Sequence, residues 1–172
     1  MKRINKKKIM LFVLLFALMC PISNVKAYNL HGHELTSKAT SYKFINTTHK
    51  TAWEQGMSSW GVCGFYFLYM SNSLNSLGSK NIGADSLLGT TYFDTINIWG
   101  ELTKYTAYLN TNTSQLSKTN WARSSAAHEI GHAIGLAHVS SAYALMSHAR
   151  DRSTIYTPQA DEKAGVKAIY GS

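Results

Sequence analysis

The chain has 172 residues and a formal net charge of +8. Six of its 17 basic residues and none of its nine acidic residues lie in residues 1–27, so residues 28–172 carry only 11 − 9 = +2. The remaining basic residues are scattered singly, which argues against nucleic-acid binding because that function needs a basic stripe on the folded part. The 145 residues after position 27 suit one domain with its own core.

The first 27 residues have the pattern of a secretory signal peptide. Residues 1–8 contain five basic residues, residues 9–20 are almost wholly apolar, and Ala27 offers a small residue for cleavage. The apolar run is too short to span a bilayer core of about 30 Å, and no later stretch has the roughly 20 apolar residues of a spanning helix. We therefore expect a secreted, extracellular protein without a membrane span.

One cysteine, Cys63, follows the predicted signal peptide, so no disulfide bond is expected within residues 28–172. It adjoins an apolar run, which predicts a buried thiol rather than a reactive one. The other cysteine, Cys20, would be acylated in a lipoprotein, but Met19 is larger than the residue that such processing usually requires. Packing and a bound metal are therefore expected to stabilise the fold.

The first half of the expected mature chain predicts strands around one helix. Residues 28–38 are polar and aperiodic, so His31 and His33 are expected to be solvated in a flexible tail. Apolar residues at near-helical spacing predict an amphipathic helix at residues 49–60. Strands are expected at residues 41–45 and 64–70, and a loop at residues 71–79.

The second half predicts strands followed by two helices. Asn120 is a favourable cap for a helix from about Trp121 to Ile134. Pro158 occupies a favoured first position of a last helix, which ends before Gly171. Short strands are expected at residues 85–93, 95–99 and 105–110. This order of elements predicts a single α+β domain with helices packed on a mixed sheet.

Residues 128–138 read His-Glu-Ile-Gly-His-Ala-Ile-Gly-Leu-Ala-His, which is the pattern of a zinc site. His128 and His132 are four residues apart, so a helix presents both imidazoles on one face. A straight helix would carry His138 away from that face, but Gly135 can adopt the left-handed conformation that reverses the chain. Three histidine ligands leave one zinc position open, which is typical of catalytic rather than structural sites.

Glu129 follows the first predicted ligand and is placed to act on water rather than to bind the metal. A carboxylate there can accept a proton from a water molecule that zinc activates. The alternative is a zinc site without catalytic function, in which Glu129 has no role. The combination of three histidines, the glutamate and the glycine favours the catalytic interpretation.

The segment resembles the metzincin metallopeptidases, and three further features resemble the matrixin branch of that clan. Residues 125–127 precede His128 as in matrixin helices. Met146 lies eight residues after His138, at the spacing of the Met-turn, which supports the zinc site from below. Residues 157–171 resemble the terminal helix of matrixin catalytic domains.

The resemblance implies a minimal metallopeptidase catalytic domain over residues 28–172. Its zincin-like fold would have a twisted mixed sheet with two helices in an upper subdomain, and a small irregular lower subdomain with a C-terminal helix. The strand at residues 105–110 would be the edge strand to which a protein or peptide substrate adds. Residues 147–156, which include Arg150 and Arg152, would wall the pocket beside the zinc.

The sequence departs from the matrixin pattern in three places. No pro-segment with a zinc-blocking cysteine is expected, because the domain begins directly after Ala27. The loop that holds calcium and a second zinc is not visible around residues 90–104. One catalytic zinc is therefore expected, and the sequence does not decide whether calcium binds. His148 stands two residues after Met146, where its ring would hydrogen-bond a transition-state oxygen or, as we favour, face solvent.

We therefore predict a secreted, monomeric zinc endopeptidase that acts on proteins or peptides. One alternative is a secreted binding module that zinc stabilises and that has lost activity, but the presence of Glu129 argues against it. Another is a zinc amidase acting on cell-wall peptides, which would use the same chemistry. No recognisable wall-binding repeat supports that second alternative.

Overall fold

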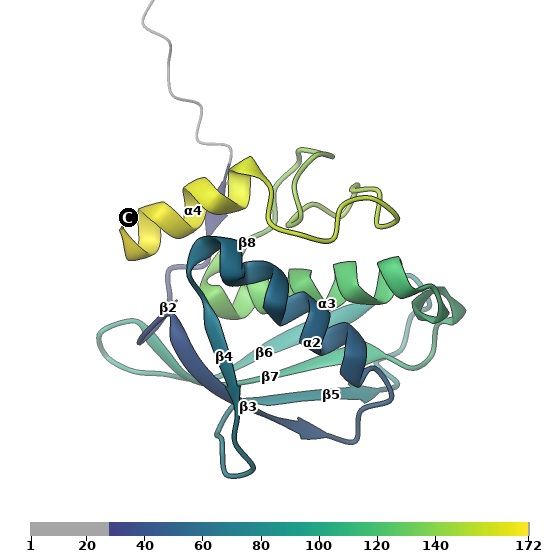
Figure 1. The fold of residues 1–172 in the computed structure, drawn as a ribbon, viewed down its shortest axis with the longest axis horizontal. Helices are drawn as coiled ribbons and strands as arrows, with labels where there is room; N and C mark the ends of the chain where they lie inside the picture. Colours follow the sequence, from purple (N-terminus) through teal and green to yellow (C-terminus); the bar gives the residue numbers. More distant parts are fainter. Residues whose placement is uncertain (1–27, 172) are drawn as a thin grey trace, which may run out of the picture.

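The computed structural model describes residues 28–171, and the predicted signal peptide at residues 1–27 lies outside them. The chain forms an α+β fold, which confirms the predicted class (Figure 1). Its strands are β1 (Asn29–Leu30), β2 (Glu34–Leu35), β3 (Ala39–Ile45), β4 (Tyr66–Tyr69), β5 (Ser76–Lys80), β6 (Gly89–Ile96), β7 (Glu101–Asn110) and β8 (Leu136–Ala137). Its helices are α2 (Lys50–Ser59), α3 (Thr119–Ile134) and α4 (Ala160–Tyr170), with the short 3-10 helices η1 (Trp60–Cys63) and η2 (Ser114–Ser117).

Strand β7 lies inside the main six-stranded sheet. Strands β2 and β5 pair with one side of β7 in parallel, and β6 pairs with its other side antiparallel. Strand β3 joins β5 to β4, again in parallel. The prediction of an edge strand at residues 105–110 is therefore wrong, because these residues have neighbours on both sides. The edge strand on this side of the sheet is β6.

Two other predicted elements differ in the structure. The loop predicted at residues 71–79 contains most of β5, which begins at Ser76. The first four residues of this strand are all buried, so it lacks the alternation that marks a half-exposed strand. In place of the two strands predicted at residues 85–93 and 95–99 there is the single strand β6, which leaves out residues 85–88 and 97–99. Its pairing register shifts after Phe93, which interrupts the alternation that a regular strand would display.

The core lies between the sheet and helices α2 and α3. Buried residues alternate along β7, as expected for a strand with one face against the core. Trp53 and Trp60 are fully buried. The indole nitrogen of Trp53 donates to the carbonyl oxygen of Gly78 at 3.1 Å, and that of Trp60 donates to the carbonyl oxygen of Ala127 at 3.0 Å. The two indoles thus link the α2–η1 segment to β5 and to α3.

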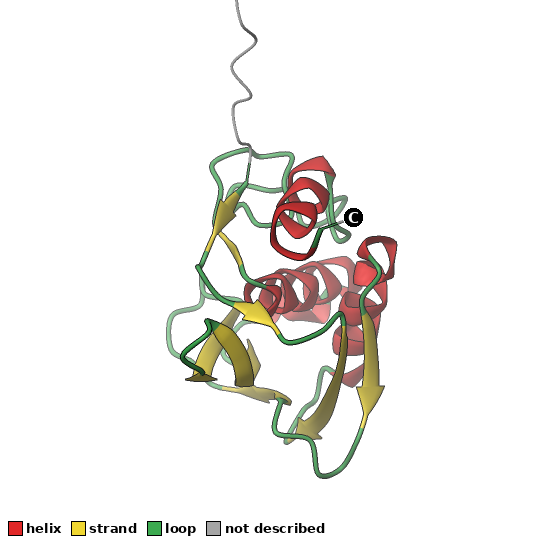
Figure 2. Ribbon diagram, turned by 90° about the vertical axis from the view of Figure 1, so that its left-hand side faces the viewer, coloured by secondary structure: helices red, strands yellow, loops and turns green. Residues whose placement is uncertain are grey.

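Helix α3 separates the main sheet from the C-terminal part of the chain (Figure 2). Helix α4 and the loop at residues 138–159 lie on the opposite side of α3 from the sheet. Strand β8 follows α3 and pairs antiparallel with β1, so the first described residues lie beside this part. Among residues 28–171, no helix has the length and apolar character that crossing a membrane requires.

Replacing Trp53 by alanine should lower the free energy of unfolding by about 3–5 kcal/mol, because it empties a fully buried indole site and removes a hydrogen bond. Urea unfolding followed by circular dichroism measures this loss. Val62→Ala is the matched control, since Val62 is 67% exposed and its truncation should change stability by less than about 0.5 kcal/mol. Equal effects of the two substitutions would contradict the described core.

Candidate metal centre

Helix α3 carries two of the three predicted ligands in its last turns. His128 and His132 are buried on this helix, which ends at Gly135 in the left-handed conformation with φ of 113°. A Cβ atom at Gly135 would also collide with the carbonyl oxygen of His33. Glycine is therefore required for two reasons at the point where the chain reverses and returns His138 through β8.

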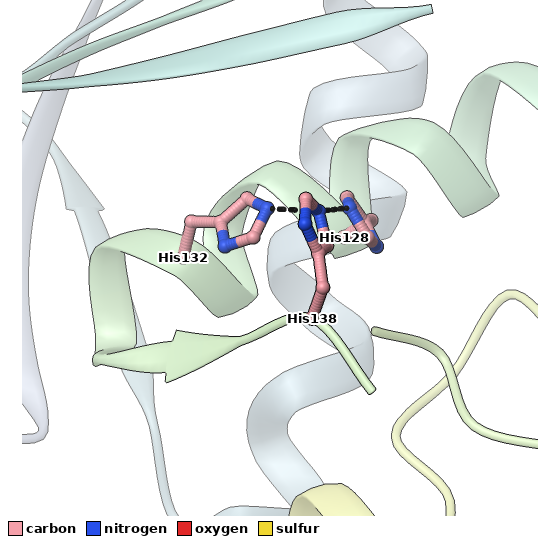
Figure 3. Close-up of side chains that lie close together, drawn as sticks. All are labelled: His128, His132 and His138. Atoms are coloured by element: carbon pink, nitrogen blue, oxygen red, sulfur yellow. Dashed lines mark hydrogen bonds between the residues drawn. The ribbon is translucent and has the colours of Figure 1, made fainter. Parts of the chain in front are cut away.

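The three histidine rings converge on one point (Figure 3). The Nε2 atom of His138 lies 3.1 Å from that of His128 and 3.0 Å from that of His132. Two nitrogens that bind one tetrahedral zinc at about 2.0–2.1 Å are about 3.3 Å apart, so the observed spacing fits a zinc ion. Within residues 28–171, these histidines are the one group of three or more His, Cys, Asp or Glu side chains arranged to hold a metal ion.

Backbone carbonyl groups orient the two helical ligands. The Nδ1 atom of His128 lies 2.8 Å from the carbonyl oxygen of Leu145, and that of His132 lies 2.9 Å from the carbonyl oxygen of Leu136. A carbonyl oxygen accepts only, so each Nδ1 must carry the hydrogen and donate it. Each Nε2 then keeps its lone pair. The Nδ1-protonated tautomer therefore leaves Nε2 free to bind a metal.

Burial favours the neutral form of all three rings. Desolvation is the main cause that lowers the pKa of His132 to about 3 and that of His138 to about 4, and it places the pKa of His128 well below its usual value. Metal binding requires neutral imidazole, so the site does not have to lose protons at neutral pH before it binds a cation.

Glu129 is buried on the face of α3 that meets β6. The hydroxyl of Thr91 lies 2.8 Å from Oε2 of Glu129, within donating distance, and 2.9 Å from the Glu129 carbonyl oxygen. A Cβ atom at Gly89 would lie 2.7 Å from the Glu129 carboxylate, so this close approach of strand and helix requires glycine. Burial raises the pKa of Glu129 to about 7, despite the opposing effect of the Thr91 hydrogen bond.

The N-terminal segment packs against the histidines, so the prediction of a flexible tail is wrong, and so is that of a solvated His33, although His31 is exposed. His33 is 6% exposed, and its Nε2 lies 3.0 Å from the carbonyl oxygen of His132, to which it donates. The Nε2 atom of His31 lies 3.1 Å from Nδ1 of His132. The side chain of Asn29 donates to the carbonyl oxygen of His138 at 2.7 Å. Pairing of β1 with β8 therefore holds this segment at the site.

His148 is exposed, as expected, but it does not simply face solvent. Its Nε2 atom lies 3.1 Å from Nδ1 of His138, and the two ring centroids are 3.9 Å apart. If Nε2 of His138 binds a metal, its Nδ1 carries the hydrogen and donates it to His148. His148 thus provides the same orienting contact for His138 that backbone carbonyl groups provide for the other two histidines.

Met146 is buried beneath α3, where its thioether sulfur occupies the space that a Cβ atom on Gly131 would need. Its backbone N–H donates to Oε1 of the buried Glu162 at 3.0 Å. The other carboxylate oxygen of Glu162 accepts from the backbone N–H of Gln159, which completes a capping box at the start of α4. Helix α4 therefore begins after Gln159, and Pro158 precedes it rather than occupying its first position.

Two residues of the site region, Thr91 and Glu162, were not predicted from the sequence. Thr91 holds Glu129 from a strand 38 positions earlier, and no local pattern marks such a contact. Arg150 and Arg152, by contrast, line the cavity as expected for the segment at residues 147–156, and Arg150 is buried there. Glu162 stands three residues after Gln159, at capping-box spacing, and this signal was available. Cys63 was expected to be buried and is half-buried in η1, where burial raises its pKa.

Comparison with known proteins agrees with this geometry. The family model described as Matrixin matches residues 67–171, which is more than half of the chain. The chain belongs to the matrixin family, and a matrixin domain indicates zinc metallopeptidase activity. No curated protein matches the chain.

A chain of the solved structure described as the GM1 bound form of the ECX AB5 holotoxin has a similar fold. The TM-score is 0.60 at 17% sequence identity, and the match covers 83% of this chain and 86% of that chain. At this identity the likeness concerns the fold alone.

Zinc should bind the purified chain at one ion per molecule and raise its melting temperature, because it binds the folded state preferentially. His138→Ala should weaken zinc affinity by at least about 100-fold, since loss of an orienting partner alone costs about 10–100-fold. Competition with a chromophoric chelator measures the affinity. His49→Ala is the control, because His49 lies at the start of α2, away from the cluster. Unchanged affinity in His138→Ala would exclude this residue as a ligand.

Proposed function

We propose that the chain is a secreted zinc endopeptidase. The observation that carries the proposal is the buried carboxylate of Glu129 in the same cavity as three neutral histidines whose Nε2 atoms converge. The cavity has a volume of about 260 Å³. Matrixin membership supports the metallopeptidase class.

His128, His132 and His138 would hold the zinc ion through Nε2. When bound, zinc supplies Lewis acidity, which polarises a peptide carbonyl group and makes water a better acid. Glu129 would accept a proton from the attacking water on its carboxylate and then donate it to the departing amine nitrogen. The Thr91 hydroxyl would hold that carboxylate in place during both transfers. Met146 would support the ligands from beneath α3, and Gly135 would keep His138 in position.

The edge strand β6 provides a place for the substrate backbone. Gly89 and Thr91 of this strand line the same cavity as Glu129. An extended peptide that added to the free edge of β6 would run past the histidines, with its scissile carbonyl group near them. This arrangement assigns to β6 the role that the sequence had suggested for residues 105–110.

The protein would be exported and would have one domain after its signal peptide. Residues 1–27 would be a signal peptide, and residues 28–172 would form a monomeric catalytic domain of the metzincin kind. The sheet with α2 and α3 would be its upper subdomain, and the part with α4 its lower one. The inactive binding module is the competing hypothesis, and the orientation of Glu129 towards the cavity argues against it. A cell-wall amidase would share the centre and differ only in substrate.

Glu129→Ala should lower kcat for peptide cleavage by about 10²–10⁴-fold, because the reaction loses its base and acid. Zinc affinity should stay within about threefold, since Glu129 supplies no ligand atom to the cluster. Cleavage of a diverse peptide library, read by mass spectrometry with and without a chelator, measures activity. Glu54→Gln is the control, because Glu54 lies exposed on α2 and pairs only with Lys50.

Undiminished turnover by Glu129→Ala would contradict the proposed role of the carboxylate. Failure of the unmodified, zinc-loaded chain to cleave any library member would favour the binding module instead.

A further inference from the structure

The cavity that holds the histidines extends to two arginines, Arg150 and Arg152. Arg150 is only 4% exposed, yet it has no carboxylate partner. Among residues 28–171, the one ion pair between side chains joins Lys50 and Glu54 on α2. Burial of a cation without a carboxylate in direct contact is costly, so this arrangement calls for an explanation.

The protein satisfies only part of the Arg150 guanidinium. Its Nε donates to the hydroxyl of Ser124 at 2.9 Å, Nη1 donates to the carbonyl oxygen of Ser147 at 2.8 Å, and Nη2 donates to the carbonyl oxygen of Ser124 at 3.3 Å. A guanidinium has five N–H groups, so two have no partner in the described chain. All three acceptors are neutral groups, so no carboxylate forms a direct ion pair with Arg150, and Glu129 and Glu162 act on its charge only from a distance.

Two further polar atoms on the cavity wall also lack partners. Ser125 is 2% exposed, and its hydroxyl oxygen is buried without a hydrogen bond. The Nε atom of the half-buried Arg152 is likewise buried without a hydrogen bond, while its Nη2 donates to the carbonyl oxygen of His148 at 3.3 Å. Buried polar groups are normally paired, so unpaired donors that line one cavity indicate a missing acceptor.

The charge on the cavity wall identifies the acceptor. Two arginines face one carboxylate, that of Glu129, which already accepts from Thr91. A carboxylate is the group that accepts from several N–H and O–H donors and also neutralises a cation. The buried Leu88 lies on the same wall, where it can pack against the methylene groups of an acidic side chain.

We propose that this cavity binds a carboxylate of the peptide substrate, held by Arg150 and Arg152 with the hydroxyl of Ser125. The inference rests on the proposed function and adds a substrate class to it: peptides with a carboxylate close to the scissile bond. The carboxylate can belong to an aspartate or glutamate side chain or to the C-terminus of the peptide. Both carboxylates would bind in the same way, but they imply different cleavage products. An acidic side chain allows cleavage within long chains, whereas a terminal carboxylate restricts cleavage to the C-terminal end of the peptide.

The test compares matched peptides built around one bond that the zinc-loaded chain cleaves. Each position flanking that bond carries glutamate, glutamine or lysine in turn, and each peptide is made with a free and with an amidated C-terminus. At one position, kcat/KM for the glutamate peptide should exceed that for the glutamine peptide by about tenfold or more, because a charge-assisted hydrogen bond replaces a neutral one. A preference in amidated peptides identifies an acidic side chain, and a preference for free termini alone identifies the terminal carboxylate.

Two substitutions assign the preference to this cavity. Arg152→Gln and, independently, Ser125→Ala should each reduce the ratio of the glutamate to the glutamine value by about threefold or more. The ratio cancels any general loss of activity. Arg123→Gln is the matched control, because Arg123 also projects from the α3 region but its guanidinium lies over the ring of Tyr156, outside the cavity. Its ratio should equal that of the unmodified chain.

Equal rates for all glutamate and glutamine peptides, with both kinds of terminus, would overturn the inference while leaving the proposed function intact. A preference that survives both Arg152→Gln and Ser125→Ala would also overturn it, because the carboxylate would then bind elsewhere. Absence of cleavage of every peptide is a different result, since it would contradict the proposed function itself.

Discussion

The reversal of the chain at Gly135 is the constraint on which the arrangement of the site depends. Helix α3 can present His128 and His132 on one face, but it cannot present His138 there while it stays straight. The left-handed residue ends the helix and starts β8, which carries His138 back towards the other two rings. The same turn offers the carbonyl oxygen of Gly135 to the backbone N–H of His31, at 2.8 Å, and so brings the N-terminal segment to the site.

Each converging histidine is oriented through the nitrogen that faces away from the centre. Leu136 and Leu145 provide carbonyl acceptors for two of the rings, and His148 provides the third contact. The carbonyl acceptor at Leu145 depends on the loop before α4, because Glu162 holds the next residue, Met146, through its backbone N–H. Packing of α4 therefore helps to keep the Leu145 carbonyl group in place, and this group holds the ring of His128 on α3 with its hydrogen on Nδ1.

The local parts of the site could be predicted from the sequence. Helical spacing explains the pair His128 and His132, and glycine at position 135 indicates the reversal that returns His138. These features depend on residues within a few positions of one another. The three helices could also be predicted, because each has a recognisable apolar spacing or a proline or glycine near its ends.

The long-range parts could not be predicted, because one sequence carries no information on which strands pair. Strand β7 has the alternation of any half-buried strand, whether it lies inside a sheet or at its edge, so the edge position was wrongly assigned to it. In strand β5 four consecutive residues are buried, so it lacks this alternation. Thr91 and His33 have no local pattern at all, since their contacts with α3 arise only when the sheet and the N-terminal segment pack.

The most direct test of the proposed centre is X-ray absorption at the zinc K-edge of the zinc-loaded chain. An open three-histidine centre predicts three imidazole nitrogens and one oxygen ligand from solvent, all at about 2.0–2.1 Å, with no sulfur. Displacement of the oxygen ligand by a hydroxamate, with the three imidazoles retained, would agree with a site open to substrate. Four imidazole nitrogens, which His31 or His148 would have to complete, would show a closed structural site and contradict the catalytic role.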